Sequence, residues 1–263
     1  MARYSTEQLD ACAAELLREG ITVLRGHLDP VLMRAWAAAF APLLDAHLVQ
    51  ESGQNRGANR HYVTLPLAGV FADPAVIADD DIVGIVERAV GPDPVMCQLA
   101  TDTPLAGSDY QPLHRDTPAL FPETGAETPP FQLAVNFPLC DVTLDNGAFE
   151  TSRRTHMMPR DQAMAAIEAG AIAVEPLTMR LGDVMIRDVR AIHRGSPNRT
   201  AIARPMVVIG YSRSWLMRPE VHIDVPAAVL AGLPPRARRL LRFNPVIDGA
   251  PPPAGERYQS FMY

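Results

Sequence analysis

Lysine is absent from this chain of 263 residues, so all 24 of its basic residues are arginines. This absence excludes chemistry that needs a lysine side chain, namely Schiff-base formation, pyridoxal-phosphate catalysis and phosphate binding by a P-loop lysine. The formal net charge of −6 argues against nucleic acid as a main partner, because phosphate backbones are bound by densely positive faces.

Cysteines and long apolar segments are also scarce. The three cysteines, Cys12, Cys97 and Cys140, form no C-x-x-C pair, which is typical of reduced thiols in a cytosolic protein. No apolar run reaches the roughly 18 residues of a membrane span. The polar start MARYSTEQLD lacks the apolar segment of a signal peptide. We therefore expect a cytoplasmic protein that binds neither membrane nor nucleic acid.

The secondary-structure pattern changes near residue 94. Before it, apolar residues recur at helical spacing, and a polar Gly/Asn-rich loop covers 50–61. After it, short apolar segments are divided by turn residues, which predicts strands at 95–100, 131–139, 171–178, 184–187 and 206–211. Helices followed by many short strands favour a mainly β sandwich or double-sheet barrel with flanking helices.

We predict a single domain over 1–263, because no segment has the composition of a linker. It would consist of an N-terminal helical layer at about 1–93, a strand-rich core at about 94–215 and a C-terminal extension at 216–263. The Pro/Gly-rich end of the extension is interpreted either as an arm over the surface or as a lid near a pocket.

The segment QPLHRD at 111–116 contains a candidate metal-binding pair. His114 and Asp116 are two residues apart, so on a strand both side chains would project from one face. His193, at the end of DVRAIH, is the candidate third ligand. Two imidazoles and one carboxylate form the facial triad of non-heme Fe(II) oxygenases, which leaves three positions on the metal open. The sequence thus predicts an iron site.

The H-x-D pattern is weak evidence by itself, because it occurs at 27–29, 114–116 and 222–224. Asp29 is better explained as the N-cap of a helix. No histidine follows His222, so the last copy has no later third ligand. Only the middle copy lies in the strand-rich part of the chain with a later histidine and a later arginine.

Arg204 is that later arginine. It stands eleven residues after His193 and just before the apolar segment 206–209, which would hold it rigidly. A 2-oxoglutarate cosubstrate needs a fixed cation for its distal carboxylate, and arginine binds carboxylates bidentately and stays charged. Arg199 is the alternative, but it lies in a turn, where exposure is more common. We therefore predict 2-oxoglutarate binding at Arg204.

Three blocks of the sequence resemble the phytanoyl-CoA dioxygenase family of Fe(II)- and 2-oxoglutarate-dependent oxygenases. They are QPLHRD at 111–116, DVTLDNGAFETSRRTH at 141–156 and GDVMIRDVRAIHRGSPNRTAIARP at 182–205, and they occur in the order typical of the family. One departure is SRRTH at 152–156, because many relatives have Pro-Gly-Ser before that histidine.

The resemblance implies a double-stranded β-helix core, the jelly roll of cupin-like proteins. It implies Fe(II) on the three predicted ligands, 2-oxoglutarate on Arg204 with further contacts from Gln111 and Asn136, and O2 as the oxidant. Related iron halogenases carry a small residue in place of the metal carboxylate, so the presence of Asp116 favours hydroxylation or a related oxidation.

The predicted reaction is oxidation of a C–H bond in a small metabolite, such as a specialised natural product, with release of succinate and CO2. Candidate substrate contacts are Arg56, Arg60 and His61 in the polar loop, together with Arg190. The CoA part of the family name is not carried over, because no nucleotide-binding motif is present.

Two other classes of function remain open from the residues. A zinc-dependent hydrolase or lyase uses the same kinds of ligand, although zinc chemistry gives no reason for Arg204. A non-catalytic jelly-roll binding protein is the second alternative. Formation of succinate that depends on Fe(II) separates all three.

Overall fold

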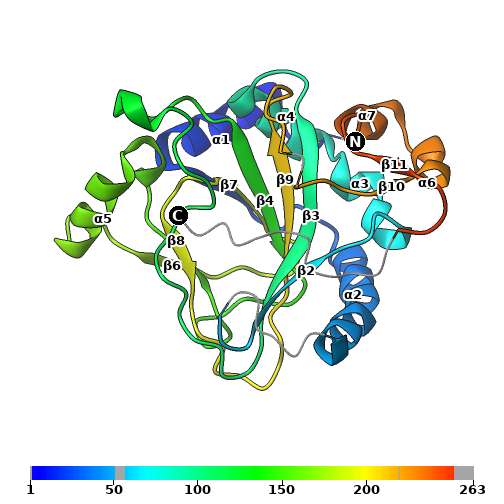
Figure 1. Cartoon of the computed structure of the whole chain (residues 1–263), viewed down its shortest axis with the longest axis horizontal. Helices are drawn as coiled ribbons and strands as arrows, with labels where there is room; N and C mark the ends of the chain where they lie inside the picture. Colours follow the sequence, from blue (N-terminus) through cyan, green and yellow to red (C-terminus); the bar gives the residue numbers. More distant parts are fainter. Residues whose placement is uncertain (1, 51–56, 219, 252–263) are drawn as a thin grey trace.

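The computed structural model describes residues 2–50, 57–218 and 220–251 (Figure 1). Its centre is an antiparallel six-stranded sheet with the order β1-β7-β4-β9-β3-β2. The strands of this large sheet are β1 (Ile21–Leu24), β2 (Arg60–Thr64), β3 (Val95–Pro104), β4 (Gln132–Pro138), β7 (Val184–Asp188) and β9 (Met206–Ser212).

A small sheet with the order β6-β5-β8 faces the large one (Figure 1). Its strands are β6 (Glu175–Leu177), β5 (Phe149–Thr151) and β8 (His193–Gly195), and a single bridge between His114 and His193 extends it by one short segment. Strands β10 (Val225–Pro226) and β11 (Val246–Ile247) form a separate parallel pair. Two facing antiparallel sheets with flanking helices confirm the predicted mainly β, jelly-roll architecture.

Helices cover the face of the large sheet that points away from the small one. The helices of this layer are α1 (Thr6–Glu19), α2 (Pro30–Gln50), α3 (Pro74–Ile77), α4 (Asp80–Val90), α6 (Ala227–Gly232) and α7 (Pro235–Leu240). Helix α5 (Arg160–Glu168) contributes no residue to the core beneath them, and 3-10 turns form at η1 (Gly69–Ala72), η2 (Pro122–Thr124) and η3 (Thr155–Met157). Trp36 of α2 is fully buried and meets Phe137 of β4 edge-on, with 5.3 Å between the ring centroids. None of the described helices is long and apolar enough to cross a bilayer.

Alternation along the strands separates the apolar core from the pocket. In β4, Leu133, Val135 and Phe137 belong to the core shared with the helices, whereas Gln132, Ala134 and Asn136 line a pocket on the opposite face. This is the period-two pattern expected of a strand between two layers. The pocket therefore opens on the face of the large sheet that the helices leave uncovered.

The large sheet contains strands from both sides of residue 94, where the sequence pattern changes. Its two edge strands, β1 and β2, come from the segment that the sequence indicates as a helical layer. A second difference concerns 111–116, which forms no strand; it follows an irregular path with one bridge at His114. Proline at 112 cannot donate a ladder hydrogen bond, which explains why pairing there is brief.

Candidate metal centre and cosubstrate pocket

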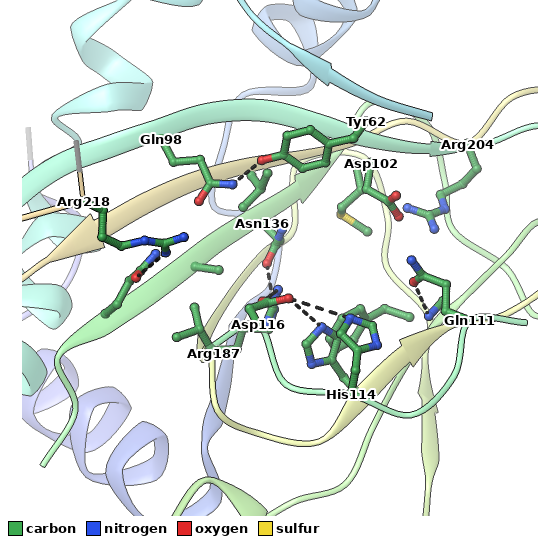
Figure 2. Close-up of a pocket in the computed structure, with 18 residues that line it drawn as sticks. Tyr62, Gln98, Asp102, Gln111, His114, Asp116, Asn136, Arg187, Arg204 and Arg218 are labelled. Atoms are coloured by element: carbon green, nitrogen blue, oxygen red, sulfur yellow. Dashed lines mark hydrogen bonds and ion pairs between the residues drawn. The ribbon is translucent and has the colours of Figure 1, made fainter. Parts of the chain in front are cut away.

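The pocket lies between the two sheets, and Figure 2 shows its lining. Side chains reach it from the large sheet, the small sheet and the segment 111–116. The lining residues used below are Tyr62, Gln98, Asp102, Gln111, His114, Asp116, Gln132, Asn136, Phe149, Arg187, His193, Gly195, Arg204 and Arg218. Because distant parts of the chain meet here, the pocket exists only in the closed fold.

The structure brings His114, Asp116 and His193 together near the middle of the pocket (Figure 2). The Nε2 atoms of His114 and His193 lie 3.7 Å and 3.5 Å from Oδ1 of Asp116. One ligand atom from each residue lies within 4.8 Å of the other two. Two imidazole nitrogens and a carboxylate oxygen that converge in this way can hold a divalent metal ion on one face.

Backbone hydrogen bonds fix the two imidazoles. His114 and His193 exchange N–H···O bonds of 3.0 Å in both directions, which places them side by side although 79 positions separate them. Each ring has its Nδ1 atom 2.8 Å from a carbonyl oxygen two residues earlier, that of Pro112 or of Ala191. A carbonyl accepts only, so Nδ1 carries the proton and Nε2 keeps its lone pair for a metal.

Asp116 reaches the same point by a different backbone contact. The segment 111–116 is not a strand, so the predicted reason for its position, two side chains on one strand face, is wrong. Instead the Asp116 N–H donates to the carbonyl of Val189 at 2.9 Å, which turns the chain after His114 toward the loop that follows β7. The carboxylate then faces the two imidazoles from one side.

The ionisation states of these ligands suit metal binding. Burial, together with the neighbouring His193, lowers the pKa of His114 to about 4. Burial alone would raise the pKa of Asp116, but the guanidinium of Arg187 overrides it and holds that pKa well below its usual value. Near neutral pH the site therefore presents a neutral imidazole at His114 and an ionised carboxylate at Asp116, the forms that a metal requires.

Arg204 lies at one end of the pocket, on the side opposite Arg218 (Figure 2). Its guanidinium makes no hydrogen bond to any residue in the described part of the chain, and its buried Nε atom has no partner there. Burial lowers the pKa of Arg204 to about 10, so the group remains a cation at neutral pH. A buried cation without a bonded carboxylate is costly, and a carboxylate ligand would offset that cost.

Gln111 and Asn136 also line the pocket, and both side chains are fixed by the fold. Oε1 of Gln111 accepts a hydrogen bond of 2.9 Å from the Gly195 N–H. Nδ2 of Asn136 donates to the Val207 carbonyl at 3.1 Å, and its Oδ1 accepts from Nε of Arg187 at 3.3 Å. The remaining donors of Gln111 are left for a ligand.

The structure does not bring the predicted substrate contacts to the pocket. Arg60 is buried and bonded to Asp102 and to the Ser196 carbonyl, both at 2.9 Å. His61 points to the other face of β2, with its Nδ1 atom 3.3 Å from Nε2 of His47 on α2. Neither residue is among those that line the pocket.

Arg190 lies outside the pocket lining as well, and Arg56 lies outside the described residues. Arg190 is fully buried and pairs with Asp188 at 2.7 Å and with Glu127 at 3.1 Å. These two ion pairs explain why an arginine is tolerated in the interior. Of the tail GAPPPAGERYQSFMY at 249–263, interpreted above as an arm or a lid, residues 252–263 are likewise outside the described part of the chain.

Sequence reasoning missed Arg187. Its side chain is 8% exposed, and its Nη2 atom lies 2.7 Å from Oδ2 of Asp116. In the segment Val184-Met185-Ile186-Arg187, alternation places Arg187 opposite the core-facing residues. A charged residue inside an apolar strand was the available signal, but its partner lies 71 positions away.

The family model of phytanoyl-CoA dioxygenase (PhyH) matches residues 16–206, which is more than half of the chain. The chain belongs to this family. Members are non-heme iron enzymes that depend on 2-oxoglutarate and use Fe(II), 2-oxoglutarate and O2. The match includes the three metal-ligand candidates and Arg204, so the residues that converge in the pocket are those that the resemblance implies.

Solved structures of similar fold include enzymes of natural-product biosynthesis. The epimerase SnoN from nogalamycin biosynthesis is 19% identical, over 80% of this chain and 84% of that chain, with a TM-score of 0.63. The carbocyclase SnoK from the same biosynthesis is 16% identical, over 81% and 85%, with a TM-score of 0.61. HygX from Streptomyces hygroscopicus, solved with nickel, 2-oxoglutarate and hygromycin B, is 14% identical, over 94% and 98%, with a TM-score of 0.60. These likenesses show a shared fold.

Proposed function

We propose that this PhyH-family enzyme oxidises a C–H bond of a small, oxygen-rich metabolite, with conversion of 2-oxoglutarate and O2 to succinate and CO2. One observation carries the proposal. A triad of two imidazoles and a carboxylate shares its pocket with a buried guanidinium that has no hydrogen-bond partner in the described structure. A metal that binds the keto-acid end of a dicarboxylate and a cation that binds its distal end account for both features together.

Each residue has a distinct role in this proposal. His114, Asp116 and His193 would hold Fe(II), which supplies activation of O2 and the oxidation itself. Arg204 would bind the distal carboxylate of 2-oxoglutarate. Gln111 lines the pocket beside Gly195 and offers an amide donor to the same ligand.

The resemblance implies a contact of Asn136 with 2-oxoglutarate, but the hydrogen bonds of this side chain favour a supporting role. Its amide bonds the Val207 carbonyl and the Arg187 side chain. We therefore propose that Asn136 shapes the wall between the metal and the cosubstrate, and that its contact with 2-oxoglutarate is secondary.

Asp116 restricts the type of oxidation. Its Oδ1 atom faces the two imidazoles and so occupies the place that a halide would need. We expect oxidation without halogenation when the reaction is run in chloride buffer. A chlorinated product detected by mass spectrometry would contradict the proposed role of Asp116.

The remaining side of the pocket suggests the substrate class. Tyr62 and Gln98 form one hydrogen-bonded pair, and Gln132 and Arg218 form another, with 3.2 Å between Oε1 of Gln132 and Nη1 of Arg218 (Figure 2). Amide, phenol and guanidinium groups recognise hydroxyl and carbonyl oxygens. An alkyl chain packed on this wall would desolvate these polar groups without bonding them, so a hydroxylated natural product fits this wall better than a lipid acyl group.

Three outcomes share the removal of hydrogen from carbon: hydroxylation, epimerisation and ring closure. The similar folds of an epimerase and a carbocyclase bring epimerisation and ring closure into the proposal. Hydroxylation and ring closure use the two oxidising equivalents on the substrate, whereas epimerisation is redox-neutral for the substrate and needs an external reductant such as ascorbate. Hydroxylation adds 16 mass units, epimerisation adds none, and ring closure removes two; these follow from the formulae of the reactions. Mass spectrometry of the product therefore assigns the outcome.

A screen for succinate tests the proposal. The protein is incubated with Fe(II), 2-oxoglutarate and ascorbate against a library of hydroxylated metabolites and, for comparison, fatty acyl compounds. We expect succinate above background with hydroxylated compounds, and none when Zn²⁺ replaces Fe(II). Turnover with Zn²⁺ and without 2-oxoglutarate would favour the hydrolase alternative, whereas binding of a metabolite without succinate would favour a non-catalytic protein.

A further inference from the structure

Arg187 touches one proposed metal ligand directly and a second through an aromatic ring. Nη2 donates to Oδ2 of Asp116 at 2.7 Å. The centre of the guanidinium lies 5.3 Å from the ring centroid of Phe149 on β5. That ring in turn stacks on His193, with 5.1 Å between the centroids and 26° between the planes. A contact path thus runs from Asp116 through Arg187 and Phe149 to His193.

The two oxygens of Asp116 consequently have different surroundings. Oδ1 faces the Nε2 atoms of both histidines, whereas Oδ2 is engaged by Arg187 (Figure 2). A charge-assisted bond of this length is among the stronger interactions in a folded protein. It leaves one carboxylate oxygen available to a metal and occupies the other.

Asn136 orients the arginine from behind. Its Nδ2 atom is bound to the carbonyl of Val207 on β9, so its Oδ1 atom faces Nε of Arg187. Arg187 is therefore held at Nε and at Nη2 by groups from two different parts of the fold. A guanidinium held at two points has little rotational freedom, and the carboxylate that it binds shares this restriction.

We propose that Arg187 is a positioning residue that restricts Asp116 to one metal-facing oxygen. Without it, the carboxylate is free to turn and to bind a metal through both oxygens, which takes up a position that the keto-acid end of 2-oxoglutarate needs. This inference rests on the proposed function, because it concerns the same metal site. Its consequence is that Arg187 governs cosubstrate binding although Arg204 makes the expected direct contact.

The test is an Arg187→Met variant loaded with Co(II), whose visible spectrum reports the number and kind of its ligands. We expect a changed Co(II) spectrum. We also expect the dissociation constant of 2-oxoglutarate to rise by about 10- to 100-fold, by analogy with the effect that loss of an outer partner of a metal ligand has on metal affinity or activity. In the Fe(II) enzyme the KM for 2-oxoglutarate should rise more than kcat falls. Arg187→Lys should restore part of the affinity, because an ammonium group still reaches a carboxylate but lacks the second donor for Asn136.

The matched control is Arg25→Met. Arg25 also makes a 2.7 Å ion pair, with Asp183, but it lies outside the pocket lining. It should leave the Co(II) spectrum and the affinity for 2-oxoglutarate unchanged. Asn136→Leu keeps the Arg187–Asp116 pair and removes only its support, so it should shift both measurements in the same direction by a smaller amount.

The outcomes separate this inference from the proposed function. If the parent protein binds Co(II) but the folded Arg187→Met variant has the same spectrum and the same affinity for 2-oxoglutarate, the role of Arg187 is refuted and the proposed function stands. If the parent protein itself binds no divalent metal at this site, both fail. If Arg187→Met does not fold, the Co(II) spectrum of Asn136→Leu without 2-oxoglutarate decides, because a contact of Asn136 with the cosubstrate does not affect it: an unchanged spectrum refutes the inference, and a shift supports it.

Discussion

Two buried arginines line the same pocket, and they differ in what they touch. Arg187 is bonded to Asp116 and Asn136 and lies over the Phe149 ring. Arg204 is at least as deeply buried, yet its guanidinium has no hydrogen-bond partner in the described part of the chain. An arginine whose bonds are made within the fold holds other side chains in place. A buried arginine whose guanidinium has no hydrogen-bond partner within the fold can instead bind a ligand.

The surroundings of the two residues account for the difference. Arg187 meets a carboxylate that belongs to the chain, so its charge is balanced on folding. Arg204 has Asp102 in the same pocket, but Asp102 is paired with Arg60 at 2.9 Å. The charge of Asp102 is thus shared with another cation, and Arg204 remains the better partner for a dicarboxylate. Local pairing, and not burial alone, separates a positioning arginine from a binding arginine.

The largest expected effect comes from removing a ligand of the proposed metal site. His193→Ala removes one of the three ligands but keeps the backbone bridge to His114, so Fe(II) binding should be lost and turnover should fall by about 1000-fold or more. Metal content of the purified protein and succinate formation check this together. A variant that keeps both iron and activity would remove His193 from the site.

The next largest effect tests the binding role of Arg204. Arg204→Ala should weaken the binding of 2-oxoglutarate by about 100-fold or more, because the two charge-assisted hydrogen bonds that it removes contribute about 3 kcal/mol or more. Fe(II) or Co(II) affinity should remain close to that of the parent protein. Calorimetric titration of the metal-free protein with Co(II), and of the Co(II)-loaded protein with 2-oxoglutarate, measures the two constants, with Arg204→Lys as the conservative comparison. An unchanged affinity for 2-oxoglutarate would end the distinction between the two arginines.

The smallest effect concerns how the stability of the metal-free protein depends on pH through His114. The pKa of His114 is lowered to about 4 in the folded protein, so the unfolded chain takes up a proton at higher pH than the folded one does. Stability that His114 provides is therefore present above about pH 6.5 and is lost as the pH falls toward 4. Between pH 7 and 4.5 this loss should reach about 2 kcal/mol.

Urea unfolding of the metal-free protein measures this loss. The comparison is His114→Leu, which has no titrating group at this position and should lose less stability over the same interval. Equal losses in both proteins would show that His114 does not titrate as proposed.

The residues of this site could be predicted from the sequence, because their types, order and spacing are typical of an iron and 2-oxoglutarate site. The order of His114, Asp116 and His193, with Arg204 eleven residues later, identified the residues that converge in the pocket. Their geometry could not be predicted, since it depends on a backbone bridge between segments far apart in the chain. Hydrophobic periodicity located four of the six strands of the large sheet, namely β3, β4, β7 and β9, but it did not show that β1 and β2 form the edges of that sheet.

The substrate contacts were the least predictable part. Arg60, His61 and Arg190 were chosen because polar residues in and near loops often meet ligands. The fold instead gives them internal partners, namely Asp102, His47 and Asp188. Sequence shows the charge of a side chain, but only the tertiary structure shows whether that charge is already balanced. The same limit hid the pairing of Arg187 with Asp116.

The bridge between His114 and His193 also affects how the protein folds. Two ligands from distant segments become neighbours only when the segment 111–116 pairs with β8 of the small sheet, and closing so long a loop costs entropy. We therefore expect the ion to join late in folding, after the roll has closed. Once bound, it favours the closed state in proportion to its free concentration. Cellular iron supply would then govern the lifetime of this protein against proteolysis as well as its activity.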